Sequence, residues 1–238
     1  MIPHPVPSRP WQTIAADLFE FQGKEYLVTT DYNSNFFEVD KLDTQTSKEV
    51  IEKLKCQMAR HGIPDQLRSD NGPQFSSHEF KQFTELYEFD HATSSPSYSQ
   101  SNGKAENSVK TAKRIMLKAL ESGTDPYLGL LDFRNTPTEG VGTSPAQRLF
   151  GRRRKTLLPT TGKLLHQADT SSTAELLQAR KDRQSFYYNN GSKALQPLNN
   201  GDTVCIKPAK HGQRWTQATV EGPAGVRSYQ VTTGDGRV

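Results

Sequence analysis

The sequence predicts an α/β domain with the element order βββαβαβ, followed by a small β-rich domain. Three patterns predict this fold class: runs of aromatic and β-branched residues typical of strands, apolar stripes with helical spacing, and Gly-rich turns between short alternating runs near the C-terminus. With 238 residues, 33% of them hydrophobic, the chain can form one full-sized core and one small core.

The first three elements are predicted to be strands at residues 11–21, 25–31 and 35–42. Gln22-Gly23 separates the first pair and Asn33-Ser34 the second. Because such short turns join neighbouring antiparallel strands, we expect a meander.

Two capping-box patterns predict the next helices. Thr46-x-x-Glu49 precedes a helix at 47–61 that Gly62 should end, and Ser76-x-x-Glu79 precedes an amphipathic helix that reaches about Tyr87. Two further short strands are expected at 66–70 and 89–93.

Residues 94–103 have the composition of a loop, and a long helix is expected from about 104 to 122. Shorter helices are expected at 127–133 and 145–150, the latter with Ser144 as its N-cap. The apolar stripe of the long helix comprises Val109, Ala112, Met116, Ala119 and Leu120.

The expected domain organisation has five parts. They are a Pro-rich lead at 1–10, the α/β core at 11–151, a basic linker at 152–172, a connecting amphipathic helix within 173–190, and a small barrel at 200–238 with strands at 203–207, 215–221 and 227–232. Trp215 is predicted to belong to the barrel core.

Several classes of protein are excluded by what the sequence lacks. No apolar run has the length of a membrane span and the N-terminus does not resemble a signal peptide, so we expect a soluble intracellular protein without a membrane partner. Cys56 and Cys205 lie far apart without further Cys or His at metal-site spacing, which predicts two ordinary buried thiols.

Charge is divided unevenly along the chain. Residues 1–151 contain 16 Lys and Arg against 20 Asp and Glu, a net charge of −4, whereas residues 152–238 contain 14 against 6, a net charge of +8. A basic second part is attracted to a polyanion such as DNA by a term that does not depend on sequence, although many basic domains bind no nucleic acid.

Three carboxylates are distinguished by their places in the predicted elements. Asp17 lies inside an otherwise apolar strand, where a charge is costly unless it is paired or binds a metal. Asp70 ends a strand before Asn71-Gly72, and Glu106 lies in the first turns of the long helix, beside Lys110 and Lys113.

The spacing of the last two acids is not decisive by itself. Asp70 and Glu106 are separated by 35 residues, as are Asp43 and Glu79, and about 0.6 such pairs are expected by chance. Asp43 follows a strand in a polar loop and Glu79 is explained by its capping pattern, so the favoured group is Asp17, Asp70 and Glu106 in the order strand, strand, helix.

Five blocks along the chain resemble the integrases of gypsy-type LTR retrotransposons and retroviruses. They are WQTIAADLF at 11–19, IPDQLRSDNGPQF at 63–75, PSYSQSNGKAENSV at 96–109, RNTP at 134–137 with SPAQRLFGR at 144–152, and GDTV, W and RSYQV within 201–231. The resemblance implies a ribonuclease-H-like core, with a mixed five-stranded sheet flanked by helices, and an SH3-like DNA-binding barrel.

The resemblance also implies an activity. Asp17, Asp70 and Glu106 would be both the catalytic acids and the ligands of two Mg²⁺ or Mn²⁺ ions, with Asp17 bridging them. The reaction would be 3′-end processing and strand transfer of retroelement DNA into a target duplex. A homodimer or higher oligomer through the core, and action in the nucleus after synthesis in the cytoplasm, are further expectations.

Candidate DNA contacts lie around these acids and in the basic regions, although solvated surface and loop flexibility would explain them equally. The candidates are Asn71, Tyr98, Gln100, Asn102, Lys104, Lys110, Lys113, Arg152, Arg153, Arg154, Lys155, Lys207, Lys210, Arg214 and Arg227.

The sequence departs from the family at both ends. The family's N-terminal zinc-binding domain is not seen, and the chain stops at Val238 inside the last expected strand, which indicates a fragment or a truncated gene product. Two alternatives therefore stay open: a catalytically inactive DNA-binding protein derived from a retroelement, and a host interaction protein that keeps the fold as a scaffold.

Overall fold

The structure, a computed structural model, describes residues 6–93, 103–167, 173–190, 196–206, 215–225 and 228–233. Contacts within the chain divide it into two compact units, Met1–Tyr188 and Asn189–Val238. Within the described ranges, no helix combines the length and the apolar character needed to cross a membrane.

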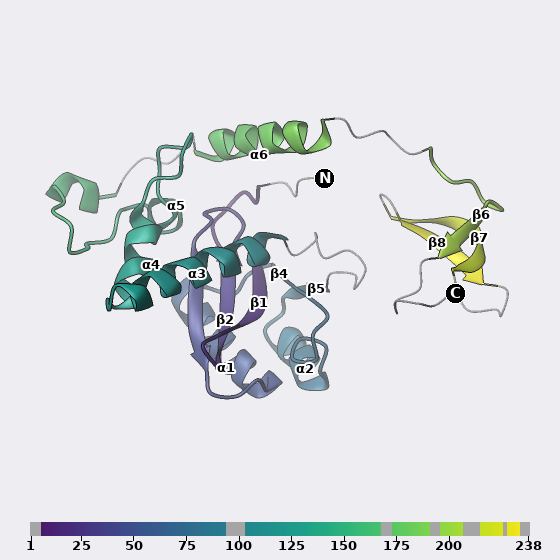
Figure 1. The fold of residues 1–238 in the computed structure, drawn as a ribbon, viewed down its shortest axis with the longest axis horizontal. Coiled ribbons are helices and arrows are strands. Elements are labelled where there is room, and N and C mark those ends of the chain that lie inside the picture. Colours follow the sequence, from purple (N-terminus) through teal and green to yellow (C-terminus); the bar gives the residue numbers. More distant parts are fainter. Residues whose placement is uncertain are drawn as a thin grey trace. The chain divides into compact units, whose positions relative to one another are not determined.

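The first unit contains a mixed five-stranded sheet (Figure 1). Its strands are β1 (Thr13–Phe21), β2 (Lys24–Asp31), β3 (Phe37–Leu42), β4 (Gln66–Ser69) and β5 (Asp90–Thr93), in the order β3-β2-β1-β4-β5. The first three are antiparallel neighbours, and β4 and β5 continue the sheet in parallel with β1. The predicted meander and the order βββαβαβ are therefore confirmed.

Helices cover both faces of this sheet (Figure 1). They are α1 (Ser47–His61), α2 (His78–Leu86), α3 (Gly103–Glu121), α4 (Pro126–Asn135), α5 (Pro145–Phe150), the 3₁₀ turn η2 (Gly162–Leu165) and α6 (Thr173–Asn189). Side chains of α1 and α2, such as Leu54 and Phe80, pack with Ile14 and Ala16 of β1. Side chains of α3 and α4, such as Met116 and Leu130, pack with Phe19 on the opposite face.

The helix starts agree with the capping patterns in two cases and differ in one. Ser144 caps α5 in a complete capping box with Gln147. Thr46 caps α1, but the predicted box is half formed, because the Glu49 carboxylate accepts from the N–H groups of Asp43 and Thr44 instead of Thr46.

The cap of α2 is Ser77, one residue later than predicted: its Oγ accepts the Phe80 N–H at 3.1 Å, whereas Ser76 still belongs to the preceding turn, in which its N–H donates to Gly72 O at 3.0 Å. The predicted role of Glu79 as a capping-box partner of Ser76 is therefore wrong.

The second unit contains the antiparallel sheet β6 (Thr203–Ile206), β7 (Thr216–Gly225) and β8 (Ser228–Thr233), in the order β6-β7-β8. Ala218 and Val220 of β7 are its buried hydrophobic side chains among the described residues. Trp215, predicted to lie in the core, is 62% exposed at the entry to β7, because the described part of this sheet has no second layer to cover it.

Four other burial predictions are wrong. Cys56 is exposed because it lies off the buried stripe of α1, and Cys205 is exposed on the outer strand β6. Leu120 is 52% exposed, because the buried stripe of α3 runs through Ala112, Met116 and Ala119. The helix α6 is not amphipathic: its apolar side chains spread around the axis, and Leu176, Phe186, Tyr187 and Tyr188 are exposed.

Candidate active site

The strand β1 carries Asp17 on the face of the sheet that α3 covers. Side chains alternate along a strand, so Asp17 shares a face with Ala15 and Phe19. Ala15 clusters with Ala105 of α3, and Phe19 clusters with Ala112 and Met116 of the same helix. The half-buried carboxylate of Asp17 therefore lies between two apolar contacts with α3.

Asp70 reaches the same level of the sheet because β1 and β4 run in parallel. Ala15 pairs with Arg68, so two residues further along each strand come Asp17 and Asp70. Asp70 is exposed just past the end of β4, and its Oδ1 accepts the Gly72 N–H at 3.2 Å. The carboxylate is thus turned toward its own loop.

The start of this loop is fixed by a buried hydroxyl. Ser69 is 1% exposed, and its Oγ donates to Asp70 O at 2.7 Å and lies 2.8 Å from His91 Nε2. The ring of His91 packs 4.9 Å from that of Phe80, and burial lowers the pKa of His91. The neighbouring strand β5 therefore holds the backbone from which Asp70 projects.

Glu106 is contributed by the first turn of α3. Its neighbour Ala105 is fully buried against Ala15 and Tyr32, and these small side chains let the helix approach the sheet closely. Glu106 itself is half-buried at the border of this contact. Two strands and one helix therefore each bring one acid to the same end of the sheet.

The electrostatics of Asp17 show that the three acids interact. The pKa of Asp17 is raised to about 6; burial is the largest cause, the Leu18 N–H and Lys113 act against it, and the charges of Asp70 and Glu106 add to it. The Leu18 N–H donates to Asp17 Oδ1 at 2.9 Å. The site therefore has more negative charge than its own residues neutralise.

The three acids supply the chemical type of ligand that a divalent cation requires. Mg²⁺ and Mn²⁺ prefer carboxylate oxygen ligands, and a cation would remove the repulsion that raises the pKa of Asp17. Among the described residues, no three His, Cys, Asp or Glu side chains lie close enough together to hold a single ion. The hydrogen bond between Asp70 and Gly72 gives one physical reason, because it turns one ligand away from the other two.

The predicted lysines of α3 do not behave alike. Lys110 and Lys113 are exposed, and Lys113 lies 5.7 Å above the ring of Phe19, beside Asp17. Lys104 points elsewhere: its Nζ donates to Asn35 and lies 5.7 Å above the ring of Tyr32. Asn71 is exposed in the Asp70 loop.

The basic run 152–155 is partly packed against the core. The guanidinium of Arg154 lies 3.7 Å above the Phe150 ring, and Arg153 Nε donates to Gln147 Oε1 at 3.4 Å. Arg152 and Lys155 are exposed. The other predicted DNA contacts lie outside the described residues; they are Tyr98, Gln100, Asn102, Lys207, Lys210, Arg214 and Arg227.

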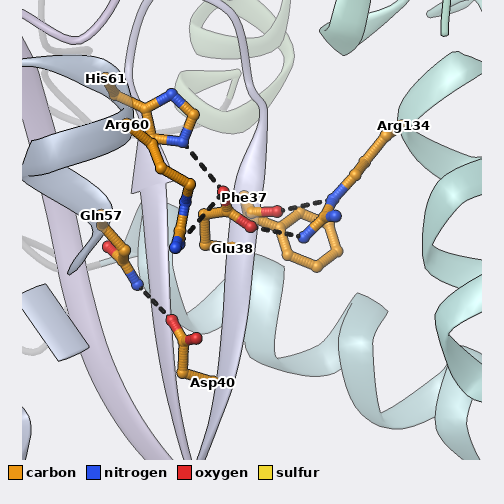
Figure 2. Close-up of polar contacts among 7 residues, drawn as sticks. All are labelled: Phe37, Glu38, Asp40, Gln57, Arg60, His61 and Arg134. Atoms are coloured by element: carbon orange, nitrogen blue, oxygen red, sulfur yellow. Dashed lines mark hydrogen bonds and ion pairs between the residues drawn. The ribbon is translucent and has the colours of Figure 1, made fainter.

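A second polar cluster, which sequence reasoning missed, surrounds Glu38 on the outer strand β3 (Figure 2). The Glu38 carboxylate accepts from Arg134 at 3.0 Å and lies 2.9 Å from His61 Nε2, with Arg60 at 3.7 Å. Burial would raise the pKa of Glu38, but the hydrogen bond from His61 and the charges of Arg134 and Arg60 hold it below its usual value. This cluster ties α1 and α4 to β3, which is a structural role.

The only sequence signal for this cluster was the presence of Arg134 in the RNTP block. Arg134 Nε also donates to Phe37 O at 3.0 Å, so the guanidinium holds both the backbone and a side chain of β3. Its partner Glu38 lies 96 positions earlier, and no local pattern links residues at such a separation.

Comparisons with known proteins show what the chain is similar to. Residues 7–99 match the family described as integrase core domain. The chain is 30% identical over 243 residues to the uncharacterized protein K02A2.6 of Caenorhabditis elegans, covering 98% of this chain and 19% of that protein. It is 30% identical over 159 residues to the Gag-Pro-Pol polyprotein of Sheep pulmonary adenomatosis virus, covering 62% of this chain and 9% of that protein. The chain therefore spans a fifth or less of the length of these relatives.

Solved structures with a similar fold are retroviral integrases. A chain of the simian T-cell lymphotropic virus intasome in complex with PP2A regulatory subunit B56 gamma has a TM-score of 0.61 and 17% identity, covering 96% of this chain and 78% of that chain. The HTLV-2 integrase catalytic core domain in complex with magnesium, in trimeric form, has a TM-score of 0.50 and 20% identity, covering 60% of this chain and 98% of that chain. Together with the mixed five-stranded sheet, these similarities show a ribonuclease-H-like fold.

Proposed function

This chain belongs to the integrase core domain family, and from that membership we propose that it catalyses metal-dependent 3′-end processing of retroelement DNA and transfer of the processed strand into a target duplex. The observation that carries the proposal is the interaction of Asp17 with Asp70 and Glu106: burial, and with it the charges of these two acids, raises the pKa of Asp17 to about 6. Three acids that repel one another at one end of a sheet are costly to the fold, and a bound cation would offset this cost.

The role of each acid follows from its position. The charges of Asp70 and Glu106 both act on Asp17, so Asp17 would be the acid common to two sites for Mg²⁺ or Mn²⁺, with Asp70 in one and Glu106 in the other. Two such ions stabilise the charge on both the attacking and the leaving oxygen of a phosphodiester and activate the attacking water or 3′ hydroxyl. The half-buried setting of Asp17 limits competing water, and the exposed loop of Asp70 leaves a path for DNA.

DNA is the proposed partner, with retroelement termini and a target duplex as the two substrates. Lys110 and Lys113 lie on the helix that carries Glu106, in reach of phosphates near the acids. We propose that the second unit, with its basic composition and antiparallel strands, belongs to an SH3-like barrel that binds DNA without sequence preference. Self-association through the core and action in the nucleus complete the proposal.

The test is cleavage and joining of a labelled blunt-ended duplex, with Mn²⁺ or Mg²⁺ compared with chelator. We expect metal-dependent products from the wild-type chain and a loss of about 100-fold or more in Asp70→Asn and Glu106→Gln. Asp43→Asn and Glu79→Gln are matched controls, since this pair has the same spacing in the sequence and should keep full activity.

Two outcomes would count against the proposal. Products that persist in Asp70→Asn and Glu106→Gln would assign the chemistry to other residues. Tight, salt-sensitive DNA binding without products in any metal would instead support a catalytically inactive DNA-binding protein.

A further inference from the structure

A cavity lies at the first turns of α3, the helix that carries Glu106. None of Asp17, Asp70 and Glu106 is among the residues that line it. Its volume is about 520 Å³, and it is bounded by the first turns of α3, the end of β2 with the loop that follows, the segment from α4 to α5, and α6. The apolar part of its wall includes Phe37, Phe133 and Leu177. This volume is in the range of pockets that hold small organic ligands.

The polar part of the wall is strongly cationic. Lys104, Arg180 and Lys181 line the cavity, and Arg148 lies near enough to Lys104 to act on its charge. The acid acting on Lys104 is Asp31, which is fully buried. Among the described residues that line the cavity, the charged ones are all cationic; Asp182 acts on the charge of Lys181, and the carboxylate that acts on Lys104 is Asp31.

That carboxylate is already saturated with hydrogen bonds. Asp31 accepts from the backbone N–H groups of Trp11 at 3.0 Å, Asn33 at 3.2 Å and Ser34 at 2.9 Å, and from the Ser34 hydroxyl at 2.6 Å. These four hydrogen bonds use the acceptor capacity of the Asp31 carboxylate, so it has little capacity to pair directly with a cation of the cavity.

The ammonium group of Lys104 is held at the cavity by its contacts. Its Nζ donates to Asn35 and lies 5.7 Å above the ring of Tyr32, and both of these residues line the cavity.

A buried hydroxyl provides a second and independent observation. Thr30 lines the cavity and is 1% exposed, and its Oγ1 has no hydrogen-bond partner among the described residues. A buried hydroxyl without a partner costs about 1 to 3 kcal/mol, so a polar ligand atom at this position would stabilise the protein.

We propose that this cavity binds the phosphate monoester of a nucleotide, with Lys104, Arg180 and Lys181 around the phosphate and the base against Phe133. A phosphate monoester carries a charge of about −1.5 to −2 at pH 7, which suits this excess of cations better than a single carboxylate does. The apolar wall offers aromatic surface for stacking, and Thr30 provides a hydroxyl for the polar edge of the ligand.

The test is calorimetric titration of the intact chain with deoxyadenosine 5′-monophosphate. We expect saturable binding that Arg180→Gln weakens at least tenfold, whereas Arg183→Gln, which removes an exposed charge three residues along the same helix, leaves it unchanged. Lys104→Met should weaken binding to a similar degree, with Lys118→Gln as the matched control on α3. Arg180 is exposed, so its variant should fold even if the change at the buried Lys104 disturbs the core.

Further ligands separate the phosphate from the base and identify the source of the nucleotide. Deoxyadenosine without phosphate should bind at least tenfold more weakly. Displacement by a 5′-phosphorylated pentanucleotide, but not by its 5′-hydroxyl form, would assign the site to a strand end, and the absence of displacement would assign it to a free nucleotide.

The proposal is overturned if deoxyadenosine 5′-monophosphate does not bind at millimolar concentration, if deoxyadenosine binds equally well, or if Arg183→Gln weakens binding as much as Arg180→Gln. Glu106→Gln should bind the nucleotide as the wild-type chain does. Nucleotide binding and DNA cleavage can therefore fail independently.

Discussion

Asp17 is the residue on which the electrostatics of the site depend. Its pKa is raised to about 6 by burial and by the two other acids, so the folded protein favours the protonated form more than the unfolded chain does. The free energy of unfolding should therefore fall as the pH rises from about 4 to about 6. Above about pH 6 the buried Asp17 carboxylate is charged and its whole destabilising effect on the folded protein is present.

Asp17→Asn removes this cost. At pH 7 without divalent metal we expect the variant to be more stable than the wild-type chain by about 1 to 2 kcal/mol, after allowance for screening by solvent. Urea denaturation at pH 4 and pH 7 measures it: the stability difference should be present at pH 7 and nearly absent at pH 4. Equal stability of the two proteins at both values would show that Asp17 is not under strain.

The stability that Glu38 contributes depends on pH in the opposite direction. Its pKa lies below the ordinary value of 4.5, so the stabilisation by its ion pairs is present above that pH and is lost as the pH falls through the lower, folded-state value. Glu38→Gln should lower the free energy of unfolding by about 3 kcal/mol at pH 7, because Arg134 would keep a largely buried charge without its partner.

Glu52→Gln is the matched control for this measurement. Glu52 pairs with Lys55 at 3.2 Å, but its side chain is 59% exposed, so its loss should cost less than about 0.5 kcal/mol. A Glu38→Gln variant as stable as this control would contradict the structural role of the Glu38 cluster.

At the residue scale, the sequence predicted the acids but not the network around Glu38. Asp17 could be identified because a charge inside an apolar strand needs compensation, and this cost is visible in a local pattern. Glu38 and Arg134 pair across 96 positions, and each looks like an ordinary polar residue in its own segment. Lys104 was grouped with the exposed lysines because its partner Asn35 also lies far away in the chain.

At the element scale, the loop after β4 sets the direction of Asp70. A Cβ added at Gly72 would lie 3.1 Å from Asp70 Oδ1 and 3.3 Å from Gln74 Oε1, so a side chain there must displace the carboxylate. Gly72→Ala should raise metal-dependent cleavage at limiting Mn²⁺ by up to about tenfold, since it disfavours the hydrogen bond that turns Asp70 away from the other two acids.

The control for this variant is Gly162→Ala. Nothing lies within 4 Å of a Cβ at Gly162, and its backbone does not require glycine. Both proteins would be compared in single-turnover cleavage and in thermal unfolding. Unchanged cleavage in a well-folded Gly72→Ala protein would show that this loop does not orient Asp70.

The elements themselves were largely predictable because their signals are local. Alternation and capping residues predicted every strand and α-helix that the structure describes, to within a few residues. The start of α2 was displaced by one residue because Ser76 still belongs to the preceding turn, and the backbone hydrogen bonds of such a turn leave no trace in composition. The prediction that α6 is amphipathic was wrong because its apolar residues, Leu176, Leu177, Phe186, Tyr187 and Tyr188, do not form one stripe at helical spacing.

At the scale of the whole molecule, the two units have separate buried residues, and the second is the more basic for its size: it contains 6 Lys and Arg against 3 Asp and Glu, whereas the first contains 24 against 23. Removal of residues 191–238 should leave the unfolding midpoint of the first unit unchanged, because its core clusters lie entirely within Met1–Tyr188. The shortened chain should bind duplex DNA more weakly and with a smaller dependence on salt, because fewer cations contact phosphates.

Calorimetric unfolding and DNA binding at two salt concentrations would test this separation. Loss of cooperative unfolding in the shortened chain would show that the units are interdependent. DNA affinity and salt dependence equal to those of the full chain would contradict the proposed role of the second unit.

We expect Asp17, Asp70 and Glu106 to act together as one divalent-metal site. Anomalous diffraction from crystals of the chain grown with duplex DNA and Mn²⁺ would locate the metal. Anomalous peaks should lie beside the Asp17 carboxylate, with Asp70 turned away from Gly72 toward the metal, and should be absent from Asp17→Asn crystals. Mn²⁺ bound elsewhere, or bound at this end of the sheet without contact to Asp17, would contradict this expectation.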